Sequence, residues 1–95
     1  MKKTKNFVLR SLGDETILIP RGRMAEMVNG VITLSHTAVF IYNMAEQAAS
    51  FEELAVWMSK EYGISLDESR KDLQETLEQM KKNGMLEESN REKSW

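Results

Sequence analysis

The amino-acid sequence predicts a single α+β domain in which three short strands are followed by three helices. Apolar residues alternate with polar ones up to residue 34, as in strands, and from residue 38 they recur with the spacing of a helix. A serine that can cap a helix precedes each helical segment, and a glycine follows each of the last two. Strands and helices that are segregated along the chain are typical of α+β folds.

The first two strands are predicted at residues 7–12 and 15–20. Gly13 and Asp14 between them are a turn signal, so the two strands should pair as a hairpin. Pro20 has no backbone N–H to donate, and it therefore ends the second strand. The pattern at residues 21–27 is ambiguous, and it leaves open whether their end is already extended.

The third strand is predicted at residues 28–34. Side chains alternate between the two faces of a strand. The face that we expect to turn toward the core carries Val28, Gly30, Ile32 and Leu34. The opposite face carries Asn29, Val31 and Thr33. This segment has no charge and no proline, which normally protect an exposed edge. It is therefore either an edge kept open for a partner or a central strand that is already paired.

The first helix is predicted at residues 36–48, and the second and third begin at the caps Ser50 and Ser65. A glutamate stands three residues after each of these serines, which is the capping-box pattern. Gly63 and Gly84 stand where the second and third helices should end. Three helices beside a three-stranded sheet give the plan of a winged helix-turn-helix with its strands first.

Length and composition fit one globular domain. The 95 residues are 41% hydrophobic and 29% charged, which is ordinary for a soluble protein. We expect a basic flexible N-terminus at residues 1–6, a folded domain at residues 7–88 and a polar, fraying tail at residues 89–95. No apolar run has the length of a membrane span, and none follows the basic N-terminus as in a secretory signal. These features lead us to expect a cytoplasmic protein.

Charge is distributed unevenly along the chain. Residues 1–23 carry six basic and two acidic residues, a net charge of +4, whereas residues 24–95 carry seven basic and thirteen acidic residues, a net charge of −6. This asymmetry is explained either by solubility alone or by a basic sheet edge that faces an acidic partner.

Seven methionines in 95 residues also have two interpretations. Most of them fall at core positions, where methionine fills gaps. Met24 and Met27, beside the third strand, are better placed to line an adaptable apolar groove that binds peptides.

The sequence offers little for catalysis. It contains no cysteine and one histidine, His36, which stands beside the helix cap Ser35. Thiolate metal sites are therefore excluded, and no second histidine is present to build another kind. The glycines form no phosphate-binding fingerprint, and no serine stands in a nucleophile-elbow pattern. We expect no enzymatic activity, no cofactor and no metal site.

A winged helix-turn-helix plan raises the question of DNA binding. The third helix carries Arg70, Lys71, Lys81 and Lys82 against five acidic residues, a net charge of −1. Affinity for DNA comes largely from positive charges near phosphates. The helix that would enter the groove of DNA thus carries the wrong charge for it.

The sequence resembles a known family, the PqqD-like small proteins, which are also called RiPP recognition elements. These bind the leader segment of a ribosomally made precursor peptide and present it to a modifying enzyme. The resemblance covers roughly residues 7–88, and the segments that carry it are Ile17-Leu18-Ile19-Pro20, Asn29-Gly30-Val31-Ile32-Thr33-Leu34, Thr37-Ala38, Ile41-Tyr42, Phe51-Glu52-Glu53-Leu54, Glu61-Tyr62, Asp72-Leu73 and Gly84-Met85-Leu86-Glu87.

Three positions depart from the family pattern. Ser35 stands where the family usually has Asn, and it still caps a helix. Tyr42 stands where Trp is frequent, and it still fills a core. Thr76 stands where an apolar residue is favoured, which could change the ligand preference.

The resemblance implies that the leader adds as an extra strand to the edge of the third strand and packs into the groove between that strand and the third helix. The peptide-binding residues implied on the strand are Val28, Asn29, Val31 and Thr33. Those implied on the helix are Ser69, Asp72, Leu73 and Thr76. The opposite flank of this helix, with Arg70, Gln74 and Lys81, is expected to face solvent.

The resemblance thus predicts a stand-alone RiPP recognition element without catalytic residues, cofactor or metal. Its implied partners are a precursor (leader) peptide and a RiPP maturation enzyme, either a radical-SAM enzyme or a lasso-type leader peptidase. No nucleic acid and no membrane is expected, and homo-oligomer formation stays open. The alternative function is a winged-helix DNA-binding transcription regulator.

Overall fold

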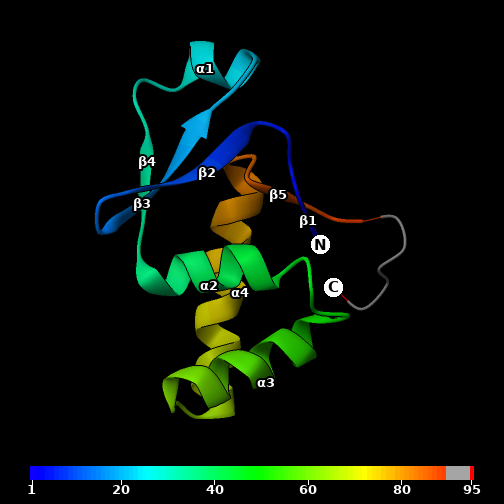
Figure 1. Cartoon of the computed structure of the whole chain (residues 1–95). Helices are drawn as coiled ribbons and strands as arrows, with labels where there is room; N and C mark the ends of the chain where they lie inside the picture. The colour runs from blue at the N-terminus through cyan, green and yellow to red at the C-terminus, as the bar shows by residue number, and fades with distance from the viewer. Residues whose placement is uncertain (90–94) are drawn as a thin grey trace.

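The computed structural model describes residues 1–89 and 95. A sheet of three antiparallel strands lies beside three helices that follow it in the chain, which confirms the predicted α+β fold (Figure 1). The strands of this sheet are β2 (Phe7–Leu12), β3 (Glu15–Pro20) and β4 (Ile32–Leu34). The three helices are α2 (His36–Met44), α3 (Phe51–Tyr62) and α4 (Leu66–Lys82).

The sheet has the order β2-β3-β4. Leu9 of β2 pairs with Leu18 of β3, and Leu18 pairs with Ile32 of β4. Because paired residues of antiparallel strands point to the same face, these three side chains lie on the face that turns toward the helices. Leu18 is fully buried there, and it connects the sheet to the core.

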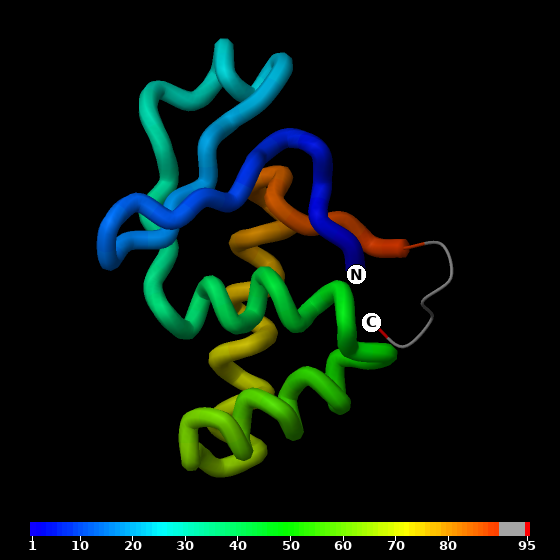
Figure 2. The backbone as a smooth tube through the Cα atoms, viewed as in Figure 1, coloured from blue at the N-terminus to red at the C-terminus, as the bar shows by residue number. Residues whose placement is uncertain are grey.

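Helix α4 runs behind α2 and past α3, and both helices pack against it (Figures 1 and 2). Its residues Leu73, Leu77 and Met80 are buried at the spacing of one helix face. Leu54 of α3 and Ile41 of α2 are fully buried in the same cluster. The helical part of the core therefore follows the apolar stripes of the sequence.

The predicted caps are confirmed. The side chains of Ser35, Ser50 and Ser65 each accept a hydrogen bond from the backbone N–H three residues later, at 3.1 Å. The Glu53 carboxylate reaches one residue beyond the expected position, because it accepts from the N–H of Ala49 rather than from that of Ser50. Helix α2 ends at Met44, earlier than predicted, since the N–H groups of residues 47 and 48 both donate to the Met44 carbonyl and tighten the chain into turns.

The segment before β4 differs from the prediction. Residues 23–27 form a short helix, α1 (Arg23–Met27), which the sequence pattern left ambiguous. Val28 is its C-cap, and Gly30 has a φ of +86°, a left-handed conformation that interrupts an extended chain. The strand is therefore restricted to residues 32–34, and the predicted start at residue 28 is wrong.

The N-terminal residues are also placed differently from the expected flexible segment. Strand β1 (Lys2–Lys3) pairs with β5 (Leu86–Glu87) after α4. The Lys3 ammonium lies 4.7 Å from the centre of the Tyr42 ring and donates to the Asn43 side chain at 2.7 Å. Residues 1–6 thus contact the folded domain. The sequence predicts a flexible tail for such a charged and polar segment, because the residues that it contacts lie far away along the chain.

The expected C-terminal tail lies largely outside the described residues, since 90–94 are not among them. Trp95 packs against the hydrophobic core, and the expectation of a fraying tail otherwise stays a prediction. Among the described residues, no helix combines the length and apolar character needed to cross a bilayer.

Candidate functional site

One edge of the sheet is open. In the described part of the chain, β4 pairs with β3 on one side and with no strand on the other. Its residues Ile32, Thr33 and Leu34 include no charge and no proline, so neither common form of edge protection is present. The backbone N–H and C=O groups along this edge can pair with another extended chain.

A groove of about 410 Å³ lies between this edge strand and α4. Its floor is apolar and is formed by β4, the start of α2, the inner face of α4 and the segment after α4, with Ile32, Leu34, Ala38, Met80 and Met85. Its α4 wall is polar and is formed by Glu75, Thr76, Gln79 and Asn83. In Figure 1, β4 lies at the left of the molecule, and α4 lies to the right of it, behind α2. An extended peptide that pairs with β4 would therefore place alternate side chains over this groove.

Local sequence explains both walls. Thr76, Met80 and Asn83 recur at intervals of four and three residues, so they lie along one flank of the helix. Ile32 and Leu34 alternate with Thr33 along the strand, and both point toward the helices. They are only half-buried, because no further strand covers the edge.

The structure separates the four strand residues that were predicted to contact a peptide. Val28 and Asn29 precede the strand, at and after the end of α1. Val31 is 50% exposed and also lies outside β4. Thr33 is in β4 and exposed, but it alternates with the groove-lining residues and therefore points to the other face of the sheet. Their peptide-binding role stays a prediction, and none of them lines the groove.

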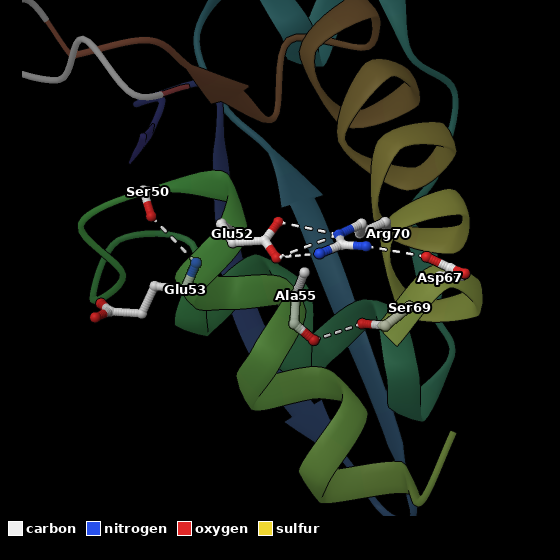
Figure 3. A network of polar contacts seen from close by, with 7 residues as sticks. All are labelled: Ser50, Glu52, Glu53, Ala55, Asp67, Ser69 and Arg70. Atoms are coloured by element: carbon white, nitrogen blue, oxygen red, sulfur yellow. Dashed lines mark hydrogen bonds and ion pairs between the residues drawn. The ribbon is translucent and has the colours of Figure 1, made fainter. Parts of the chain in front are cut away.

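Of the four residues of α4 that were predicted to contact a peptide, two lie on the groove flank and two are buried. Thr76 lines the groove, and Asp72 is exposed one turn earlier on the same flank. Ser69 and Leu73 are fully buried and do not line the groove, so their predicted contact with a ligand has no support from the structure and stays a prediction. The Ser69 hydroxyl donates to the Ala55 carbonyl at 2.6 Å (Figure 3), and Leu73 fills the core. Both side chains hold α4 against its neighbours.

Most of the groove residues escaped the sequence prediction. The floor residues Ile32 and Leu34 were assigned to the core, because apolar alternation does not distinguish a covered strand from an edge strand. Gln79 and Asn83 had a usable signal, since they follow Thr76 at helical spacing. Met24 and Met27, the methionines proposed for a groove, do not line this one.

The opposite flank of α4 is occupied by contacts within the protein. The Arg70 guanidinium donates to the Glu52 carboxylate on α3, at 2.6 Å for the shortest pair, and to Asp67 at 2.9 Å (Figure 3). The hydrogen bond from Arg70 holds the pKa of the Glu52 carboxyl below its usual range. This flank also borders a second cavity of about 380 Å³, lined by Met1, Phe51, Gln74, Leu77, Glu78, Lys81 and Trp95.

The described residues contain no cluster of three or more side chains that could hold a metal ion. His36 is exposed, and its Nδ1 atom lies 3.4 Å from the Tyr62 hydroxyl oxygen. The groove thus carries donors and acceptors for binding, and the one histidine lies outside its lining.

A solved structure shares the fold of this chain. This structure, described as TbiB1 in complex with the TbiA(beta) leader peptide, matches with a TM-score of 0.70 and 19% sequence identity, over 95% of this chain and 100% of that chain. At this identity the match shows the fold. No curated protein matches the chain in sequence.

The sequence model of one family, described as Coenzyme PQQ synthesis protein D (PqqD), matches residues 15–86. This span begins at β3 and ends in β5, so it includes the edge strand and all of α4. Because the match covers more than half of the 95 residues, the chain belongs to the PqqD family.

Proposed function

We propose that this protein binds the leader segment of a ribosomally made precursor peptide by adding it as a strand to the open edge of β4, and that it presents the peptide to a maturation enzyme. The observation that carries the proposal is the uncharged, unprotected edge of Ile32–Leu34 directly beside an apolar groove. Main-chain hydrogen bonds along such an edge supply affinity, and the groove beside it supplies side-chain selectivity.

Family membership and the shared fold support this function. The solved structure with the same fold is a complex with a leader peptide, and it matches 95% of this chain. The groove of about 410 Å³ is large enough to accept one or two side chains of such a peptide. Its apolar floor can contact apolar side chains of the leader, and its polar wall can contact polar ones.

DNA binding has less support. Helix α4 occupies the position of a recognition helix, and its groove flank carries Asp72 and Glu75. Both charges repel phosphates, and affinity for DNA depends on positive charges at those positions. The alternative of a transcription regulator is therefore not favoured by the site.

Amide hydrogen exchange tests the binding mode. The leader of the cognate precursor should slow exchange at Ile32–Leu34, because strand addition gives those backbone groups new partners. A scrambled leader of the same composition is the control. Protection that appears only on α3 would contradict strand addition.

A second experiment tests presentation to the enzyme. With limiting precursor, the chain should raise the rate of the maturation enzyme by lowering its apparent KM, because holding both partners makes their encounter intramolecular. Removing the leader should abolish the stimulation. Mass spectrometry should find the precursor unchanged when the chain alone is present, and a modified peptide would overturn the adaptor role.

A further inference from the structure

The two flanks of α4 differ in how their charges are satisfied. On the flank away from the groove, Arg70 pairs with Glu52 and Asp67, and Lys81 pairs with Glu88 at 3.1 Å. On the groove flank, Asp72 and Glu75 have no ion pair or hydrogen bond with any residue that the structure describes. Lys71 and Lys82 lie near Glu75 along the exposed face of α4, but neither forms an ion pair with it. Arg70 and Lys81 are thus held by carboxylates of the fold, whereas Asp72 and Glu75 have no such partner among the described residues.

Glu75 is the charged residue that lines the groove. The apolar floor beside it includes Ile32, Leu34 and Met80, and no lysine or arginine lines the groove. Arg10, from the basic half of the chain, lies on β2 at the other edge of the sheet. The basic sheet edge considered from the sequence therefore does not coincide with the groove, and Glu75 is the one charge in its lining.

An uncompensated carboxylate beside an apolar groove selects among ligands. A peptide laid along β4 removes part of the water around Glu75, which is unfavourable unless the peptide brings a positive charge. A peptide with an acidic residue at that position is repelled, and this penalty contributes to specificity as much as the attraction does.

We infer that the bound segment is cationic and amphipathic, with an apolar side chain over Ile32, Leu34 and Met80 and a lysine or arginine two residues away that pairs with Glu75. The spacing of two follows from the strand, because alternate side chains point to the same face. This inference rests on the proposed function, since it names the chemistry of the peptide that the groove takes.

Selection from a random library of 12-residue peptides displayed on bacteria tests it without knowledge of the natural leader. The folded chain should enrich peptides with Lys or Arg two positions from an apolar residue. Glu75→Gln should lose this preference and weaken binding of an enriched peptide about five- to tenfold. Glu78→Gln is the matched control, because it removes the same charge three residues further along α4, outside the groove lining, and it should keep the preference.

Charge reversal sharpens the test. An enriched peptide with its basic residue changed to Glu should bind poorly to the natural protein and regain affinity for Glu75→Lys. Enrichment of acidic residues, or no charge preference, would overturn this inference, and the proposed function would stand if such peptides still slow exchange at Ile32–Leu34. Failure to enrich any peptide would overturn both.

Discussion

The two flanks of α4 carry polar side chains of the same kinds, but they face different surroundings. On one flank Arg70 is held by carboxylates of α3 and of its own helix. On the other, Thr76 and Glu75 face a groove beside an open strand edge. The difference shows that polarity alone does not distinguish a structural flank from a binding flank. The distinction comes from whether the fold supplies partners for the polar groups.

Both flanks depend on the same buried stripe, so a change there should have the largest effect. Leu73→Ala should lower the free energy of unfolding by about 2–5 kcal/mol, because it leaves a cavity at a fully buried position. Urea denaturation followed by circular dichroism measures it. Leu12→Ala is the control, since Leu12 is 65% exposed and its loss should cost about 0.5 kcal/mol or less. Equal effects would mean that α4 is not anchored as described.

A second prediction compares the flanks directly. Thr76→Arg should weaken binding of a library-selected peptide about tenfold or more, roughly 1.4 kcal/mol, because the long cation fills the groove and neutralises its acidic rim. Gln74→Arg introduces the same side chain on the far flank and should change affinity less than twofold. Fluorescence anisotropy measures both variants. Equal losses would place the ligand elsewhere on the protein.

A third prediction concerns Ser69, which the sequence assigned to the ligand and the structure assigns to the core. Ser69→Ala should cost about 1 kcal/mol of stability, because the buried hydrogen bond to the Ala55 carbonyl is lost. Peptide affinity of the folded variant should not change. Ser11→Ala, at an exposed strand position, should alter neither quantity. A loss of peptide affinity with unchanged stability would mean that Ser69 contacts the peptide.

The smallest effect is expected at the Glu52–Arg70 pair. The folded pKa of Glu52 is lowered by its hydrogen bond with Arg70, so its stabilising effect is present above the unfolded pKa and is lost as pH falls through the folded pKa. The difference in urea midpoint between the natural protein and Glu52→Gln should therefore be greatest near neutral pH and vanish in acid. Peptide binding should be the same for both proteins. A difference that grows in acid would contradict the assigned direction.

Local features were predicted well from the sequence. Ser35, Ser50 and Ser65 cap helices, because a serine side chain satisfies backbone N–H groups only three residues away. The hairpin around Gly13 depends on equally local chemistry. The apolar stripe of α4 follows from helical spacing, and it placed Leu77 and Met80 in the core. In each case the partners lie within a few residues of one another.

The candidate site was predicted only in outline. An edge strand beside the third helix was anticipated, and Thr76 lies in the groove. Thr33 was predicted to contact the peptide, yet the groove is lined by its neighbours Ile32 and Leu34. Which face of a strand meets a groove depends on what covers that face, and periodicity does not contain this information. The same holds for Ser69, whose partner lies 14 residues away on another helix.

The sequence by itself determined the α+β order of elements, the caps and turns, the buried helix stripes and the resemblance that led to the PqqD family, because these depend on short-range patterns. Only the tertiary structure decided that β4 begins at Ile32 and that Lys2–Lys3 pairs with Leu86–Glu87. It also decided that Arg70 on one flank of α4 has ion-pair partners, while Glu75 on the other has none among the described residues. The physical reason is that burial, strand pairing and charge compensation are properties of groups brought together from distant parts of the chain.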